Sequence, residues 1–326
     1  MKHLNRRRLL ALAAAAPVAL PRLAHAETYP ARSVTMVVPH AAGGPVDVVG
    51  RLVAQGLDAE LRQGFVVENR AGASGVVGAG YVVKQPADGY TLYFNASIHI
   101  VNPLTRKEPA GFDVIKDFTP IAKVARGPVV FSVPPSLGVE TLPAFVAKAK
   151  ADPAKMNFAI SGFGSAGHMM TELFRLRSGL SLPLVLYRGG GPAVNDLIAG
   201  HVSAFIDPIL SALPQIRAGR VKALAIGAKA RSPHLPDVPT FAELGYPGLD
   251  LETWYGVWGP AGLPAPVVAT LETAIAKVVA GETFRSRLGD LGFEPDSLGS
   301  SAFSSFISAE YARYVALVAE AGIAPQ

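Results

Sequence analysis

The sequence contains no cysteine. This absence excludes disulfide bonds, thiolate metal ligands, cysteine nucleophiles and a lipid-modified cysteine anchor. Disulfides often stabilise small exported domains, but a chain of 326 residues is long enough to bury a core without them. A chain of this length also exceeds what one hydrophobic core usually serves, so we expect two lobes.

Long apolar runs are absent beyond the N-terminus. Residues 9–20 are almost entirely Leu, Ala and Val, but this run is shorter than the roughly 20 residues of a membrane-spanning helix. Basic residues precede it and Ala24-His25-Ala26 follows, which is the pattern of a secretory signal peptide. We therefore predict a signal peptide at residues 1–26, cleaved after Ala26, and a periplasmic mature protein without membrane insertion. Arg6-Arg7-Arg8 fits either Sec or twin-arginine export.

An excess of charge of one sign is also absent once the signal peptide is set aside. Residues 1–26 hold five of the 30 Lys and Arg and none of the 25 Asp and Glu, so 25 of each remain. This balance, without a basic stretch interleaved with aromatic residues, excludes the electrostatic surface that nucleic-acid binding needs. We expect no nucleic-acid partner.

Catalytic and metal-binding motifs are absent as well. The histidines after residue 26 show no metal-ligand spacing, and neither a phosphate-binding P-loop nor a G-x-S-x-G motif occurs. Gly162–Gly167 matches G-x-G-x-x-G, but Arg188 stands where a dinucleotide site would place an acidic residue. We expect no enzyme, no metal and no cofactor. The enzyme alternative is an exported NADP-dependent oxidoreductase that uses this loop.

Short apolar strands alternate with amphipathic helices, which indicates an α/β fold. Strands are expected at residues 34–39, 65–68, 90–95, 129–133, 157–160, 184–187, 205–206 and 223–227. Residues 118–124 lead into the strand at 129–133, and residues 248–259 are expected to form a long extended segment. Helices are expected at residues 45–62, 76–84, 142–151, 166–178, 192–199, 266–280, 283–291 and 302–321. Ala122–Pro128 and Pro233–Pro247 suit crossings between lobes. Two crossings predict a discontinuous lobe 1, residues 27–124 plus 249–326, and an inserted lobe 2, residues 125–248.

One arrangement occurs twice: a strand, a glycine-rich loop and a helix N-terminus. The loops are His40-Ala41-Ala42-Gly43-Gly44 and Ser161-Gly162-Phe163-Gly164-Ser165. Each leaves unpaired backbone N–H groups at the positive end of a helix dipole, which suits a carboxylate. With one loop in each lobe, the pair would hold a small acid between them. The alternative is that both are ordinary strand-to-helix turns.

Polar residues beside these loops have two interpretations each. His40 either donates to a bound carboxylate or is a polar residue of the cleft wall, and His168 either contacts the ligand or braces its loop. Asp47 stands in the first turn of its helix, where capping is the main expectation. Asp207 ends a strand and either holds a ligand amine or hydroxyl or braces the hinge. Tyr187–Gly191 is a third candidate cleft loop.

Together these segments resemble the Bug family of periplasmic solute-binding proteins, the receptors of tripartite tricarboxylate transporters. The similar segments run in order over nearly all of residues 27–326: Tyr29-Pro30, Val37–Pro39, Ala42–Gly44 with Asp47, Val67–Arg70 with Gly72, Ala87–Leu92, Asp117–Ile121, Gly164-Ser165 with His168, Tyr187 with Gly189-Gly190, Ala223–Ala225, Pro236–Thr240 and Trp254–Gly256.

This resemblance implies a two-lobed periplasmic-binding-protein fold of type II, with a ligand cleft between lobes joined by two crossover segments. It implies a receptor for a small carboxylate (a di- or tricarboxylate, an acidic amino acid or an aromatic acid) that acts as a monomer with transporter subunits or a sensor domain. The glycine loops would bind one carboxylate, and the rest of the pocket would select the solute. The implied ligand-binding residues are His40, Ala41, Ala42, Gly43, Gly44, Asp47, Asn95, Ser97, Ser161, Gly162, Phe163, Gly164, Ser165, His168, Tyr187, Arg188, Gly189 and Asp207.

Three positions depart from the family pattern. His40 stands where an aromatic residue is usual, Leu186 where a proline commonly precedes the tyrosine, and Arg188 where lysine is frequent. Because of these departures, the resemblance does not identify the solute. A structural or sensory module whose cleft binds nothing is a third hypothesis.

Overall fold

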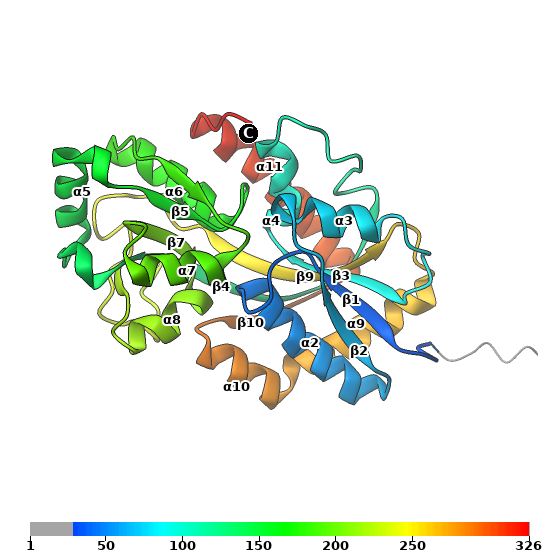
Figure 1. Cartoon of the computed structure of the whole chain (residues 1–326). Helices are drawn as coiled ribbons and strands as arrows, with labels where there is room; N and C mark the ends of the chain where they lie inside the picture. The colour runs from blue at the N-terminus through cyan, green and yellow to red at the C-terminus, as the bar shows by residue number, and fades with distance from the viewer. Residues whose placement is uncertain (1–28, 326) are drawn as a thin grey trace, which may run out of the picture.

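The computed structural model describes residues 29–325, and the predicted signal peptide lies outside them. Strands and helices alternate through most of the chain (Figure 1). The strands are β1 (Val34–Val38), β2 (Phe65–Asn69), β3 (Thr91–Ala96), β4 (Phe118–Val133), β5 (Phe158–Ile160), β6 (Leu184–Leu186), β7 (Ala204–Pro208), β8 (Lys222–Gly227), β9 (Glu252–Pro260) and β10 (Glu294–Gly299). The α-helices are α2 (Pro45–Leu61), α3 (Val76–Val82), α4 (Ile98–Val101), α5 (Leu142–Ala151), α6 (Ala166–Ser178), α7 (Gly190–Ala199), α8 (Ile209–Arg217), α9 (Ala265–Ala280), α10 (Glu282–Asp290) and α11 (Ser300–Glu320).

The sheet has two halves that share β4. Its strands run in the order β2-β1-β3-β9-β4-β7-β5-β6, with β8 and β10 also paired to β4. Residues Phe118–Pro128 of β4 pair with β9, whereas Val129–Val133 pair with β7 and β8. We call the group around β1, β2, β3, β9 and β10 the β1 half, and the group around β5, β6, β7 and β8 the β5 half. In Figure 1 β4 and β9 run from one half into the other.

Each half contains parallel strands joined through helices. In the β1 half, β1 pairs in parallel with β2 and β3; in the β5 half, β5 pairs in parallel with β6 and β7. Parallel neighbours need a crossover connection, and helices such as α2 and α6 provide it. Since the carboxyl ends of parallel strands lie at one sheet edge, the loops after β1 and after β5 open toward the space between the halves.

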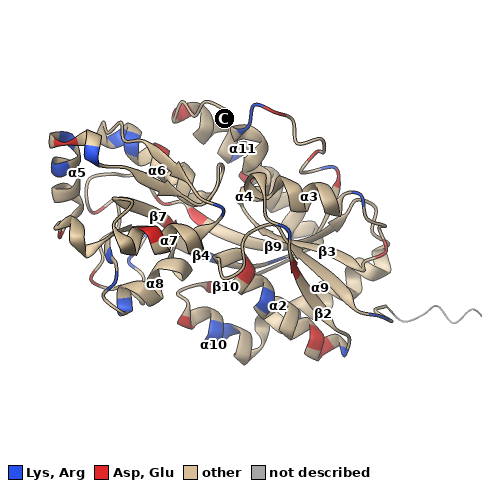
Figure 2. Ribbon diagram, viewed as in Figure 1, with Lys and Arg blue, Asp and Glu red and all other residues tan. Residues whose placement is uncertain are grey.

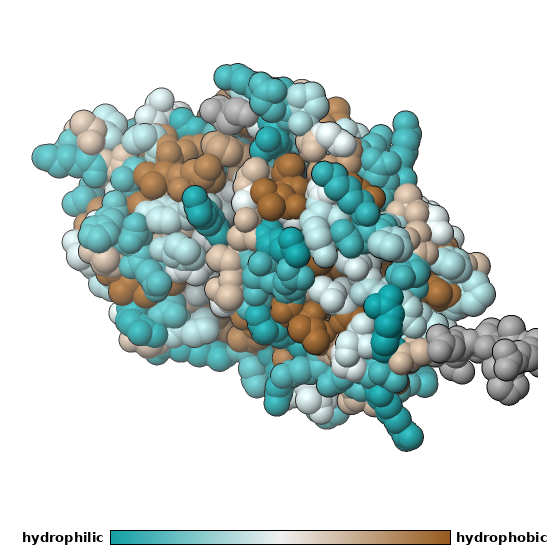
Figure 3. Space-filling model, turned by 45° about the vertical axis from the view of Figure 1, so that its right-hand side comes forward, coloured by the Kyte–Doolittle hydropathy of each residue, from teal (hydrophilic) through white to brown (hydrophobic). Residues whose placement is uncertain are grey.

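Aromatic and branched aliphatic side chains fill both halves. Phe131 on β4 contacts Phe145, Phe158 and Phe174, so strand and helix rings form one cluster in the β5 half. The surface in Figure 3 is mostly hydrophilic, with separate hydrophobic patches. No helix within residues 29–325 is long and apolar enough to cross a membrane.

Several elements differ from the sequence-based expectations, among them β4, β10 and α8. Residues 118–124 and the strand expected at 129–133 form one continuous strand, β4, whose ends pair with different halves. Neither β10 nor α8 was expected. β10 is polar and contains Pro295, and α8 contains Pro214, so neither shows a clear local pattern. Pairing with β4 gives β10 its conformation.

Candidate functional site

A cavity lies between the two halves, where loops from both meet. It contains about 470 Å³ of unfilled space, part of it open to solvent. We call it the front cavity. The residues that line it are His40, Gly44, Pro45, Val46, Ala96, Ser97, Ile98, Ser161, Ser165, Ala166, Gly189, Gly190, Asp207, Pro208, Thr253 and Tyr255.

Four helices begin at this cavity. Gly44 is the N-cap of α2, Ser165 of α6, Gly189 of α7 and Pro208 of α8, and all four residues line the cavity. The first N–H groups of a helix lack intrahelical partners, and the helix dipole places partial positive charge there. The partial positive charge at the front cavity therefore comes from helix ends and not from basic side chains, since no Lys or Arg is among the described residues that line it. Figure 2 shows Lys and Arg spread over outer helices and loops of both halves.

Asp47 holds the first glycine loop, residues 40–44, through hydrogen bonds. One Asp47 oxygen accepts from the Gly43 N–H at 2.9 Å and from Arg51 Nε at 2.9 Å, and the other accepts from Asn69 Nδ2 at 2.8 Å. Burial alone would raise the pKa of Asp47, but the hydrogen bonds from Arg51, Gly43 and Asn69 outweigh it and lower the pKa. The carboxylate is thus charged and engaged within its own loop, and it does not line the front cavity.

The second glycine loop is held by the first turn of α6. Ser165 Oγ accepts from the His168 N–H at 3.1 Å, and His168 Nδ1 accepts from the Gly164 N–H at 3.1 Å. Since Nδ1 accepts a backbone N–H, the neutral ring carries its proton on Nε2, which lies 3.7 Å from Glu172. His168 therefore braces the loop, which was one of its two expected roles.

The third loop approaches the cavity through its glycines. A Cβ on Gly190 would lie 2.5 Å from Asp207 Oδ2, so only glycine leaves room for the carboxyl group. Gly189 has φ +125°, which favours glycine. Tyr187 instead donates to Asp196 at 2.6 Å, and neither Tyr187 nor Arg188 lines the cavity.

Asp207 lies against the cavity with two serine donors. Its Oδ1 accepts from Ser161 Oγ at 2.9 Å and its Oδ2 from Ser211 Oγ at 2.5 Å, while only 2% of the residue is exposed. Burial raises its pKa to about 7, against the opposite effect of the two hydroxyls. Asp207 can therefore gain or lose a proton near neutral pH.

His40 is neutral and bound to Asn95. The Asn95 Oδ1 accepts from the Ala96 N–H at 2.8 Å, and this backbone donor fixes the orientation of the amide. His40 Nε2, 3.1 Å from the same oxygen, must then donate. Burial lowers the pKa of His40 to about 4, although the bond to Asn95 acts in the other direction. In this neutral form the other ring nitrogen, Nδ1, carries no proton and can only accept a hydrogen bond.

Ser97 lines the cavity, but its hydroxyl is buried. The residue is 1% exposed, and the side chain of Tyr314 on α11 lies within hydrogen-bonding reach of that hydroxyl. The Ser97 hydroxyl therefore belongs to the contact with α11.

The structure brings seven of the predicted site residues to the cavity: His40, Gly44, Ser97, Ser161, Ser165, Gly189 and Asp207. The other eleven lie behind or beside it: Ala41, Ala42, Gly43, Asp47, Asn95, Gly162, Phe163, Gly164, His168, Tyr187 and Arg188.

Nine lining residues were not among the predicted site residues: Pro45, Val46, Ala96, Ile98, Ala166, Gly190, Pro208, Thr253 and Tyr255. Alternation along β9 puts Thr253 and Tyr255 on one face, but the sequence does not say which face meets the cavity.

Within residues 29–325 no group of three or more His, Asp or Glu side chains is placed to hold a metal ion. The glycines at 162–167 also have packing reasons of their own. A Cβ on Gly167 would collide with the carbonyl oxygen of Ile206, and one on Gly164 would lie 3.0 Å from the Asn102 nitrogen. Close packing thus explains the G-x-G-x-x-G match without a dinucleotide.

Comparison with known proteins gives consistent matches over most of the chain. Residues 49–323 match the model of the tripartite tricarboxylate transporter family receptor. The chain is 37% identical to the protein BugT of Bordetella pertussis over 324 residues, which covers 98% of this chain and 99% of BugT.

Two solved structures with bound carboxylates are similar to this one. Rpa4515 of R. palustris with adipate has a TM-score of 0.88 and 36% identity, over 91% of this chain and 100% of that one. MatC of Rhodopseudomonas palustris with bound malate has a TM-score of 0.83 and 32% identity, over 89% of this chain and 100% of that one.

Proposed function

Because this chain belongs to the tripartite tricarboxylate transporter receptor family, the Bug proteins, we propose that its front cavity binds one small carboxylate-bearing solute for delivery to membrane transporter subunits. The fold is the α/β fold of periplasmic binding proteins, as predicted. The family and its solved members are solute-binding proteins and not enzymes, which argues against the oxidoreductase hypothesis. Export through the predicted signal peptide and action as a monomer are part of the proposal.

The convergence of four helix N-termini is the observation that supports a carboxylate ligand. A helix N-terminus favours a nearby anion by about 0.3–1 kcal/mol when exposed and up to about 2 kcal/mol when partly buried. The N-caps of α2, α6, α7 and α8 all line the front cavity. Their effects act on the same small volume, so an anion is the ligand that this cavity favours.

We assign the carboxylate to the N–H groups of the first turns of α2 and α6, which follow Gly44 and Ser165. The bound adipate and malate of the two similar structures support a small carboxylate as the class of solute. Asp207 would repel a charged group placed against it, so the solute's carboxylate is expected nearer α2 and α6 than Asp207. Neutral His40 would accept from a hydroxyl, an amine or water.

A thermal-shift assay on residues 27–326 tests this function. The ligands are adipate, malate, citrate, glutamate, benzoate and NADP, each at millimolar concentration. A ligand at 1,000 times its dissociation constant stabilises the fold by about 4 kcal/mol, which raises the melting temperature by several degrees. We expect at least one carboxylate to give this shift. A shift with NADP alone, or binding of no carboxylate in calorimetry, would contradict the proposal.

A further inference from the structure

Ser74 joins the two halves beside the front cavity. Its Oγ accepts from the Phe163 N–H at 3.1 Å, although 89 residues separate the two in sequence. Ser74 follows β2 in the β1 half, and Phe163 lies in the glycine loop after β5. Ser74 is not among the residues that line the front cavity. The contact therefore connects the halves without belonging to the ligand pocket.

The backbone at this contact is unusual. Ala73 has φ +46° and Ser74 has φ +54°, in the left-handed region that costs about 1–2 kcal/mol for a residue with a side chain. Asn102 Nδ2 donates to the Ser74 carbonyl at 3.2 Å and holds this conformation. Strain of this kind persists where the surroundings demand it, and it often marks a functional position.

The glycine loop fits closely against the same surface. A Cβ on Gly162 would lie 3.1 Å from Ile98 Cδ1 and 3.4 Å from Ser74 Oγ. These contacts exist only while the halves are together. A contact present in the closed state and absent from the open state shifts the equilibrium toward closure, and the apparent ligand affinity rises with the closed fraction.

We propose that Ser74 is a positioning residue that raises ligand affinity by holding the closed state, without touching the ligand. This inference rests on the proposed function. Ser74→Ala removes the acceptor and keeps the left-handed backbone. We expect roughly 2- to 10-fold weaker binding of adipate or malate, whichever binds the wild type, with an unchanged melting temperature of the ligand-free protein.

Ala73→Gly is the matched control, because it relieves strain and keeps the hydroxyl. We expect a higher melting temperature and no weaker binding. Equal affinity of wild type and Ser74→Ala would overturn the proposal. If the wild type binds neither adipate nor malate, affinity cannot be compared. The role of Ser74 is then tested by hydrogen exchange at the Phe163 amide. Faster exchange in ligand-free Ser74→Ala supports the contact, and equal exchange overturns it.

A second inference comes from the opposite face of β9. Side chains alternate across a strand, so Thr253 and Tyr255 face the front cavity whereas Glu252 and Trp254 face the other side. There they line a groove with about 1,480 Å³ of unfilled space, part of it open to solvent, which we call the rear groove. The front cavity and the rear groove thus lie on opposite faces of one strand shared by both halves.

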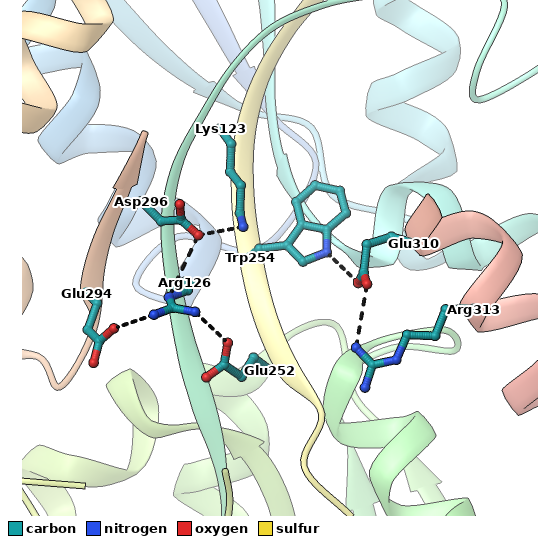
Figure 4. Close-up of polar contacts among 8 residues, drawn as sticks. All are labelled: Lys123, Arg126, Glu252, Trp254, Glu294, Asp296, Glu310 and Arg313. Carbon is teal, nitrogen blue, oxygen red and sulfur yellow. Dashed lines mark hydrogen bonds and ion pairs between the residues drawn. The ribbon is translucent and has the colours of Figure 1, made fainter. Parts of the chain in front are cut away.

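Charged pairs cover the wall of the rear groove in the β1 half (Figure 4). Arg126 of β4 lies 3.0 Å from Glu294 and 3.6 Å from Glu252, and Trp254 Nε1 donates to Glu310 of α11 at 3.2 Å. An irregular register in β4 between Lys123 and Ala125 lets Lys123 reach the same face as Arg126.

The opposite wall comes from the β5 half. Residues 228–234, which follow β8, bring Lys229, Arg231 and His234 to the groove. The other wall and the hinge contribute four acids, Asp250, Glu252, Glu294 and Glu310, and three bases, Lys123, Arg126 and Arg313, so the acids exceed the bases by one. Within residues 29–325 no ion pair is formed between segment 228–234 and these acids; Arg231 instead pairs with Glu243 of its own half.

We infer that this charge arrangement favours the open state. A hinge that widens the front cavity narrows the rear groove, which brings segment 228–234 toward the acids. The resulting attraction stabilises the open state and lowers ligand affinity. It should be weakened by salt, because exposed charges are screened beyond about 10 Å at 0.1 M ionic strength.

Lys229→Glu tests this inference with Lys148→Glu as control. Lys148 is an exposed lysine of α5 in the same half, outside the groove, so both variants change net charge equally. At low salt we expect Lys229→Glu to bind the same carboxylate roughly 2- to 5-fold tighter than Lys148→Glu, with the difference lost at 0.5 M NaCl. Equal affinities at low salt, or tighter binding by Lys148→Glu, would overturn it. If no carboxylate binds, small-angle scattering of the ligand-free variants decides: a more compact Lys229→Glu supports the inference, and equal compactness overturns it.

Discussion

At the scale of single residues, the site combines positive helix ends with one titratable acid. Asp207 is buried against the cavity where α7 and α8 begin, and its two serine partners do not fully offset burial. His40 is neutral above about pH 4, and burial raises the pKa of Tyr255, which also lines the cavity and stays protonated. Near neutral pH, Asp207 is therefore the group whose protonation changes the charge of the cavity.

Asp207 predicts a pH-dependent stability. Its pKa rises from 3.8 to about 7 on folding, so between these values the folded chain keeps a proton that the unfolded chain has lost. The free energy of unfolding therefore decreases as pH rises through this window. We expect Asp207→Asn to lose less stability than the wild type between pH 5 and 8, by up to about 3 kcal/mol. Urea unfolding of both proteins at pH 5 and pH 8 measures this difference. An equal change in the free energy of unfolding for both proteins would refute it.

The protonation state of Asp207 also affects the affinity for the ligand. A ligand carboxylate bound at α2 and α6 shares the front cavity with Asp207 and is bound more weakly once Asp207 is charged, because like charges repel. We expect the affinity of the wild type for a carboxylate to fall above pH 7, and that of Asp207→Asn to stay level. Calorimetric titrations at pH 6 and pH 8 compare the two proteins, and a wild-type affinity independent of pH would count against this role.

Two neighbouring glycines of α7 predict opposite outcomes. A Cβ on Gly190 would lie 2.5 Å from Asp207 Oδ2, whereas one on Gly191 would meet no described atom within 4 Å. Gly190→Ala should displace the Asp207 carboxyl and weaken ligand binding at least 10-fold, while Gly191→Ala should bind like the wild type. Titration calorimetry of both variants tests this pair. Normal binding by Gly190→Ala would show that the cavity tolerates a shift of Asp207.

At the scale of elements, the helix starts form the cavity and the helix bodies fix them in place. Helix α2 is held from one side by β2 and from the other by α9 and α10. The Asp47 bonds to Gly43 and Asn69 tie the start of α2 to its loop and to β2. A helix that is anchored in this way presents its N-terminus in a fixed position, which preorganises the site.

The contact between α2 and α9 gives a prediction about stability alone. A Cβ on Gly56 of α2 would collide with Val278 of α9, so Gly56→Ala should destabilise the fold by about 1–3 kcal/mol. Gly289 of α10 has no described neighbour within 4 Å of an added Cβ, and Gly289→Ala should stabilise by up to about 1 kcal/mol. Denaturant unfolding measures both values. The idea fails if Gly56→Ala is as stable as the wild type.

At the scale of the whole molecule, β4 and β9 connect two halves that contact each other at the front cavity. Direct contacts such as Ser74 with Phe163 favour closure, and charges of the rear groove oppose it. The free energy of ligand binding then combines the contacts within the pocket with the free-energy difference between the open and closed states. The lobe boundaries at residues 124/125 and 248/249 remain a prediction, although β4 changes its pairing partners between Pro128 and Val129.

Closure predicts a change in size on binding. A compact chain of 300 residues has a radius of gyration of about 19 Å. We expect the ligand-free protein to exceed this value and the carboxylate-saturated protein to approach it, as measured by small-angle X-ray scattering. A radius that does not change at saturation would mean that binding does not move the halves.

The sequence by itself determined the local elements of this protein. The glycine loops, the start of α2 at Pro45 and the start of α6 at Ala166 follow from residue chemistry within a few positions. The sequence also determined the balanced charge, the family and the absence of a metal-binding motif. All of these are properties of short segments or of composition, and they need no knowledge of distant contacts.

Only the tertiary structure decided which segments meet. It placed the starts of α7 and α8 at the same cavity as α2 and α6, put Thr253 and Tyr255 on the front face of β9, and directed Asp47 toward its own loop. It also formed β10 by pairing with β4 and brought Ser74 to Phe163. Hydrophobic periodicity shows that a strand or helix has a buried face, but not which distant element covers it.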